Sequence, residues 1–274
     1  MRGTSTDTDL IPPAIAAHAI ATYSLPGDLV LDPACGAGIV LVTALQAGRH
    51  ALGLTTDSRW WTLARANITA TKAAGAWHDG SILDASPKAL TTIHAAGLVG
   101  RVGLVLTSLR TATGDPGEHT TGLDRDPTAT IDELAATLAC CEPLLRAGGH
   151  LVVVARPRRN TDGSLADLTT PLIAAGISAG LAPVDRCVAL SAELRGERLV
   201  SRASFADRRA VARARVTTGT PIALTAHHEV LVFRLAHDAE LAAAGADSSL
   251  PFDHKTATRP VVNGVDYPDW RRAA

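Results

Sequence analysis

An acidic turn and two closely spaced glycines follow the first apolar run of this chain. Residues 28–38 read Asp-Leu-Val-Leu-Asp-Pro-Ala-Cys-Gly-Ala-Gly. The apolar run predicts a buried strand that ends at Asp32, and the apolar residues after Gly38 predict a helix. Gly36 and Gly38 would let the backbone pass close to a ligand, where a Cβ atom would collide. This order restricts the fold to a sheet with crossover helices and a ligand site at the carboxyl edge of the sheet.

Apolar runs alternate with helical patterns as far as about residue 190, which predicts βαβ units and a parallel sheet. The expected strands are 28–32, 51–55, 76–78, 102–107, 149–155, 183–190 and 229–235. The expected helices are 10–22, 38–47, 58–73, 86–96, 129–146 and 165–179. We divide the chain into an N-terminal helical segment (1–24), a main domain (25–235) with an insertion at 191–226, and a partly extended or disordered tail (236–274).

Composition limits the class of protein. Hydrophobic residues make up 46% of the 274 residues, which is enough for a large core, and the net charge of -1 does not by itself predict a nucleic-acid partner. The four cysteines lack metal-ligand spacing, so we expect no metal site and a reduced, cytoplasmic protein. No apolar run reaches the ~18 residues of a membrane span, and the first residues lack the apolar core of a signal peptide.

The segment between Glu193 and Val216 is basic, with a net charge of +4. Arginine suits phosphate oxygens because its guanidinium donates two parallel hydrogen bonds, so the segment is a candidate nucleic-acid contact. The alternative interpretation is an ordinary solvated helix face. The arginines are Arg195, Arg198, Arg202, Arg208, Arg209, Arg213 and Arg215.

Several segments in order resemble one enzyme family. The turn has the form Asp-Pro-x-x-Gly-x-Gly, and further matching segments lie at 11–23, 53–60, 144–154 and 228–234. Together they resemble S-adenosylmethionine (SAM)-dependent DNA amino-methyltransferases, in particular an actinobacterial DNA-methylase-like group similar to tRNA guanosine-N2 methyltransferases. The resemblance implies a Rossmann-like class I methyltransferase fold, an α/β fold with helices on both faces of a seven-stranded sheet whose last strand is antiparallel. It also implies SAM as cofactor, with the N-terminal helix closing on the cofactor site.

The resemblance assigns cofactor contacts to Asp32, Pro33, Cys35, Gly36 and Gly38. It also places an acid for the ribose hydroxyls at the end of the second strand, where this chain has Thr55, with Asp57 as the nearest substitute. A further acid near the end of the third strand would contact the adenine amine. The candidates for that role are Asp79, which we assign, and Asp84.

The family's catalytic loop follows the fourth strand and reads Asp/Asn/Ser-Pro-Pro-aromatic. Here the loop is Ser108-Leu109-Arg110-Thr111. By the resemblance, the Ser108 side chain and the Leu109 carbonyl would accept the protons of a base amine, but the prolines and the base-stacking aromatic residue are replaced. Loss of stacking alone removes ~1–3 kcal/mol of base binding. The loop therefore predicts weakened catalysis.

Three functions remain open from the sequence. The first is a methyltransferase that acts on an exocyclic base amine of nucleic acid, with DNA preferred to RNA. The second is an inactive pseudo-methyltransferase that serves as a nucleic-acid- or partner-binding module, for example in a heterodimer with an active methyltransferase. By analogy with small enzymes of this type, a homodimer is the other assembly that we consider. The third is a small-molecule methyltransferase, for which a loop without stacking aromatics would suffice.

Overall fold

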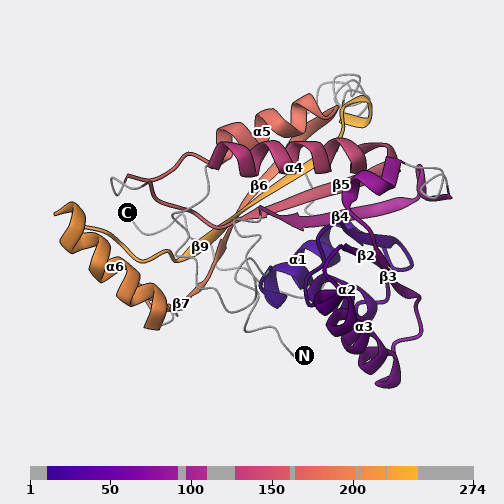
Figure 1. Cartoon of the computed structure of the whole chain (residues 1–274), viewed down its shortest axis with the longest axis horizontal. Helices are drawn as coiled ribbons and strands as arrows, with labels where there is room; N and C mark the ends of the chain where they lie inside the picture. Colours follow the sequence, from indigo (N-terminus) through magenta and orange to yellow (C-terminus); the bar gives the residue numbers. More distant parts are fainter. Residues whose placement is uncertain are drawn as a thin grey trace, which may run out of the picture. The chain divides into compact units, whose positions relative to one another are not determined.

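A seven-stranded sheet forms the centre of the described part of the chain (Figure 1). The computed structural model describes residues 11–91, 97–109, 127–160, 164–201, 203, 205–219 and 221–239. The strand order is β3-β2-β1-β4-β5-β9-β6, and β9 runs antiparallel to both of its neighbours while the other paired strands run parallel. The strands are β1 (Leu29–Asp32), β2 (His50–Thr55), β3 (Gly80–Asp84), β4 (Val102–Ser108), β5 (Leu145–Ala155), β6 (Leu181–Leu190) and β9 (His227–Leu235).

Helices cover both faces of this sheet, as Figure 1 shows. One face carries α1 (Pro13–Tyr23), α2 (Ile39–Gln46) and α3 (Ser58–Ala73), and the other carries α4 (Pro127–Cys141), α5 (Thr169–Ser178) and the short 3-10 helices η2 (Pro87–Thr91) and η4 (Glu142–Leu144). The predicted fold class is therefore confirmed, including the antiparallel last strand. None of the helices in the described part of the chain has the length and apolar character needed to cross a membrane.

The core consists of two aliphatic layers, one on each side of the sheet. Val30 packs on the α1–α2–α3 side and Leu31 on the α4–α5 side, and both side chains are fully buried. Successive side chains of a strand point to opposite faces, so a strand that is apolar at every position is buried on both. Only 3% of the residues are aromatic, and Phe233 is the largest fully buried side chain of the described core.

The predicted boundaries hold for α3 but not for the third strand. The third strand was expected at 76–78, whereas β3 spans Gly80–Asp84. Residues after α3 instead form a turn, in which Gly75 has a φ of 109° and Trp77 is 78% exposed. The helix expected at 86–96 is the 3-10 helix η2 over its first half, and residues 92–96 lie outside the described chain.

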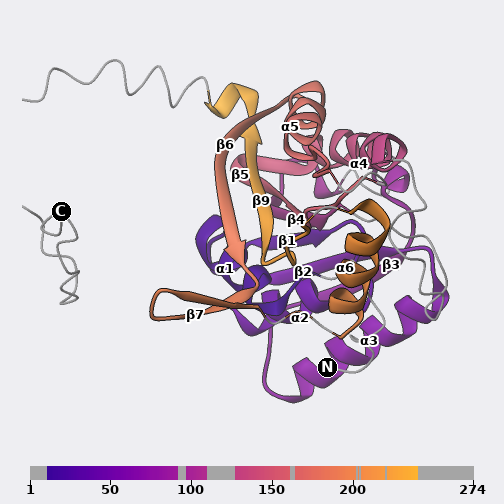
Figure 2. The same ribbon diagram turned by 90° about the vertical axis from the view of Figure 1, so that its left-hand side faces the viewer.

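The basic segment is an insertion between β6 and β9. It contains a hairpin of β7 (Ala192–Arg195) and β8 (Arg198–Ser201), followed by α6 (Phe205–Thr218). The hairpin projects beyond the end of β6 (Figure 2). Because β6 runs parallel to β5, the insertion leaves and rejoins the sheet at the carboxyl edge, the edge at which β1 and β4 also end.

Candidate active site

The turn after β1 has the backbone geometry that its glycines predicted. Gly36 and Gly38 have φ angles of 47° and 79°, in the left-handed region that glycine adopts without strain. Asp32 is 5% exposed, and its Oδ1 accepts a hydrogen bond of 3.0 Å from the Ala34 amide. Gly38 is the N-cap residue of α2, so the first amide groups of this helix lie at the end of the turn. The turn joins the strand at which the sheet order reverses, between β1 and β4, where ligands bind in open α/β sheets.

Neighbouring elements hold this turn in place. The Cys35 amide donates to the Leu54 carbonyl of β2 over 2.9 Å, and the Gly38 amide donates to the Cys35 carbonyl over 2.7 Å. A Cβ atom on Gly53 would lie 2.8 Å from the Cys35 Cβ, so β2 and the turn approach as closely as a glycine allows. On the helix side, a Cβ on Gly38 would lie 3.0 Å from the Cβ of Ala64 in α3.

Asn67 is a site-supporting residue that the sequence analysis missed. Its side-chain amide donates a hydrogen bond of 3.0 Å to the Ala37 carbonyl, which lies between the two glycines, and the residue is 6% exposed. It lies on the buried face of α3, between Ala64 and Thr71. An asparagine on an otherwise inward-facing stripe of a helix is the signal that would have found it, because buried amides need partners.

Thr55 and Asp84 end β2 and β3, and they are paired in the register of these two strands. The residue proposed as a substitute acid, Asp57, is instead the N-cap of α3. Its carboxylate accepts from the Arg59 amide over 2.8 Å and forms an ion pair of 3.0 Å with the Arg59 guanidinium. The side-chain hydrogen bond from Arg59 lowers the pKa of Asp57, so the group is ionised and engaged in capping.

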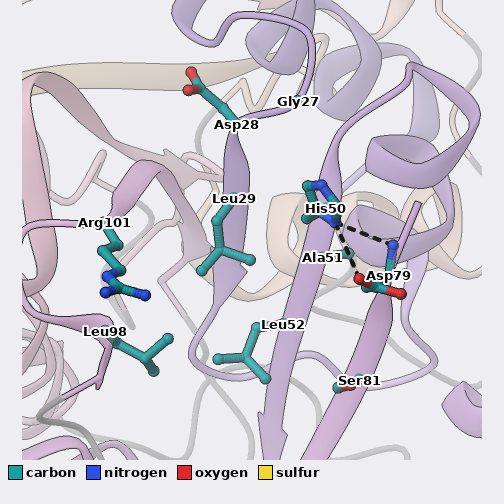
Figure 3. Close-up of a pocket in the computed structure, with 10 residues that line it drawn as sticks. All are labelled: Gly27, Asp28, Leu29, His50, Ala51, Leu52, Asp79, Ser81, Leu98 and Arg101. Carbon is teal, nitrogen blue, oxygen red and sulfur yellow. Dashed lines mark hydrogen bonds and ion pairs between the residues drawn. The ribbon is translucent and has the colours of Figure 1, made fainter.

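The assignment of Asp79 to the adenine contact loses its structural basis. Asp79 precedes β3, at the amino edge of the sheet, and its carboxylate lies 3.8 Å from His50 (Figure 3). The same carboxylate lies 3.9 Å from Lys72. The misplacement follows from the wrong position of the third strand. Asp84, the second candidate, ends β3 at the carboxyl edge, on the same side of the sheet as the turn.

Ser108 ends β4 and thus lies at the edge expected for the catalytic loop. Leu109, the next residue, continues the ladder: its amide donates to the Val154 carbonyl of β5 over 2.9 Å, and the residue is 6% exposed. A proline at position 109 has no amide hydrogen and could not make this bond. Arg110 and Thr111 lie outside the described residues.

The arginines of the insertion divide into two groups. Arg215 donates two hydrogen bonds, of 2.9 and 2.6 Å, to the Ile222 carbonyl, and Arg195 pairs with Glu193 at 3.0 Å. All of the described arginines of the insertion, these two included, are exposed, and Arg202 lies outside the described chain. On α6 the exposed residues Arg208, Arg209 and Arg213 share a face with Phe205 and Val216, which are 79% and 87% exposed.

The fold can be compared with solved structures. TrmN from Thermus thermophilus superposes with a TM-score of 0.51 at 15% identity, over 82% of this chain and 49% of that protein. Geranyl diphosphate methyltransferase in complex with SAM superposes with a TM-score of 0.51 at 14% identity, over 81% of this chain and 85% of that one. The chain has the class I methyltransferase fold. It spans about half the length of TrmN. No protein-family model and no curated protein matches the sequence.

Proposed function

We propose that the protein is a SAM-dependent methyltransferase whose cofactor binds at the turn between Asp32 and Gly38. The observation that supports this most is the pair of left-handed glycines at the switch point of the sheet, next to a buried aspartate and the amide groups that begin α2. A Cβ atom at either glycine would strain the backbone and occupy space beside the turn. SAM supplies an electrophilic methyl group, and the residues that would hold it are Asp32, Thr55 and Asp84 at the ends of the first three strands.

We further propose that the methyl acceptor is an exocyclic base amine of nucleic acid, with DNA preferred to RNA. The lone pair of such an amine is delocalised into the ring, so an acceptor for its protons is needed. The Ser108 hydroxyl and the Leu109 carbonyl would fill that role, in keeping with the resemblance of the loop to the family motif. The exposed arginines of α6 support a polyanionic substrate, because the insertion emerges at the same edge of the sheet as Ser108.

A second candidate function is a pseudo-methyltransferase that binds nucleic acid without methylating it. It is favoured by Leu109, whose amide and side chain are both committed to the sheet and the core. In this position the family has a proline that defines a loop. A small-molecule methyltransferase is the third candidate, and the two enzymatic candidates share the same cofactor site.

Two measurements separate these functions. Calorimetry of the full chain with SAM, and with its demethylated product, should give saturable binding; no heat and no thermal shift at about 1 mM cofactor would reject both enzymatic proposals. Transfer of a tritiated methyl group should then be assayed on DNA, on RNA and on a mixture of small amines. We expect label in DNA and loss of that label in Ser108→Ala, and an unchanged rate in this variant would remove Ser108 from the mechanism.

Nucleic-acid binding by α6 can be tested through salt. The affinity for a DNA duplex should fall steeply with salt, and Arg208→Gln/Arg209→Gln should flatten that slope by about two counterions. Arg215→Gln is a poor choice, because Arg215 holds the Ile222 carbonyl and its loss would alter the fold of the insertion. The matched control is Arg65→Gln on α3, where the guanidinium stacks 5.0 Å above the Trp61 ring. An unchanged slope in the double variant would reject α6 as the contact.

A further inference from the structure

A cavity of about 440 Å³ lies at the amino edge of the sheet, the edge opposite to the proposed cofactor turn (Figure 3). Its floor is formed by Leu29 of β1 and Leu52 of β2, and Leu98 borders it from the segment that precedes β4. Its polar lining includes Arg101 on one side and His50 and Asp79 on the other, as Figure 3 shows. The volume is within the ~300–1,000 Å³ typical of small-molecule sites.

The cavity exists because this half of the sheet lacks a long covering helix among the described residues. Leu52 pairs with Leu31 of β1 and with Ser81 of β3, and Leu29 lies two residues before Leu31. Because successive residues of a strand point to opposite faces, all of these side chains point to the α4–α5 face. The 3-10 helix η2 ends at Thr91 and buries Leu90 against this face. Among the described residues, the short segment around Leu98 packs against the part of this face that lies near the amino edge of the sheet.

The polar side chains of the cavity are two carboxylates, Asp28 and Asp79, and three potential hydrogen-bond donors, His50, Ser81 and Arg101. The Asp79 carboxylate lies 3.8 Å from His50 and 3.9 Å from Lys72, on the side of the cavity opposite to Arg101. The Asp79 amide donates to His50 Nδ1 over 3.1 Å, so a neutral His50 must bear its hydrogen on Nε2. Asp28 is already paired with Arg146 at 2.9 Å. Within the described part of the chain, by contrast, no hydrogen bond or ion pair involves the guanidinium of Arg101. Among the residues that the structure describes, the Arg101 guanidinium thus has no carboxylate partner, and it lies beside an apolar floor.

We propose that this cavity binds a small organic carboxylate with an aliphatic or aromatic body. The carboxylate lies against the Arg101 guanidinium, which can accept it through two parallel hydrogen bonds. The apolar body covers Leu29, Leu52 and Leu98, and the His50 Nε2–H and Ser81 hydroxyl provide further donors at the rim. This site is separate from the proposed methyltransferase site, so it stands or falls independently of the proposed cofactor.

The test uses the full chain with 4-phenylbutyrate, 4-phenylbutanamide and inorganic phosphate as probes, in calorimetry and in ligand-observed NMR. We expect saturable binding of the carboxylate below about 1 mM, and binding of the amide that is weaker by about tenfold or more. Arg101→Gln should weaken the carboxylate by at least about tenfold and leave the amide unchanged, because only the charge contact is lost. Arg65→Gln, on the outer side of α3, should change neither.

Three results would overturn the proposal. The first is absence of saturable carboxylate binding at about 10 mM. The second is equal binding by Arg101→Gln and by the unaltered protein; because Arg101 is exposed, an unchanged melting temperature will show that the variant is folded. The third is binding of phosphate in preference to the carboxylate, since the leucine floor would then have no role. Addition of SAM should not displace the carboxylate, whatever the outcome of the cofactor experiments.

Discussion

Gly53→Ala tests the close approach between β2 and the glycine turn. The new Cβ would lie 2.6 Å from Leu41 Cδ1 and 2.8 Å from the Cys35 Cβ, whereas ordinary contact begins at 3.4 Å. The Leu41 methyl group must therefore retreat by about 0.8 Å and the Cys35 Cβ by about 0.6 Å. Leu41 is fully buried, and the Cys35 Cβ is one bond from the backbone of the turn, so neither can move alone.

The energetic cost follows from this overpacking. Forcing an extra methyl group into a packed core costs about 1–3 kcal/mol. For a folded region of this size, each kcal/mol lowers the melting temperature by roughly 2–4 °C. We therefore expect Gly53→Ala to melt roughly 2–12 °C lower, as measured by circular dichroism. Because Cys35 belongs to the turn, we also expect weaker binding of SAM in calorimetry.

Gly97→Ala is the matched control. No atom lies within 4 Å of a Cβ at Gly97, and its φ is outside the left-handed region, so the same chemical change should not lower the melting temperature and should raise it by at most roughly 4 °C. If Gly53→Ala has the same melting temperature as Gly97→Ala and binds SAM as tightly as the unaltered protein does, the steric argument for β2 and the turn is wrong.

Three further predictions concern other contacts. Asn67→Ala leaves the Ala37 carbonyl without its side-chain donor and should lower the free energy of unfolding by about 1–3 kcal/mol in urea titrations, and it should weaken SAM binding more than Gly97→Ala does. Burial and then the nearby Arg234 lower the pKa of His150 from 6.5, so the unfolded chain takes up the proton first and stability should fall as the pH decreases below about 6.5; His150→Gln should reduce that slope, and equal slopes would exclude the group. Gly176→Ala should destabilise α5 despite the higher helix propensity of alanine, because its Cβ would clash with a buried phenylalanine ring; a variant more stable than the unaltered protein would contradict this.

Part of the fold could be predicted because some turns and helix boundaries are marked by residues close together in the sequence. The Asp32–Gly38 turn was predicted because proline, glycine and a following apolar run are short-range signals. The third strand was misplaced because Ala76, Trp77 and His78 resemble a strand, whereas β3 itself is an edge strand whose residues are largely exposed. An exposed edge strand carries little apolar signal, so its position depends on pairing with β2 rather than on its own residues.

The residues that support the site were also harder to predict, because their roles depend on contacts with other segments of the chain. Asn67 and Ala37 are 30 residues apart, and their contact depends on how α3 packs against the turn. The role of Asp57 depends on where α3 begins, which turns a possible cofactor contact into a helix cap. The hydrogen bond between Arg215 and the Ile222 carbonyl could not be predicted either, because it depends on how the chain folds back after α6. The neighbouring arginines on α6 are exposed, as expected for a charged segment.

The ladder bond at Leu109 makes this position intolerant of proline. A proline here would remove the amide that donates to the Val154 carbonyl, and it would also empty the space of a buried leucine side chain. The unpaired carbonyl alone costs about 1–3 kcal/mol. The residue after β4 is therefore fixed by the stability of the sheet as well as by any role at the site. A change that would reshape this loop for chemistry has to be compensated elsewhere in the core before the protein can tolerate it.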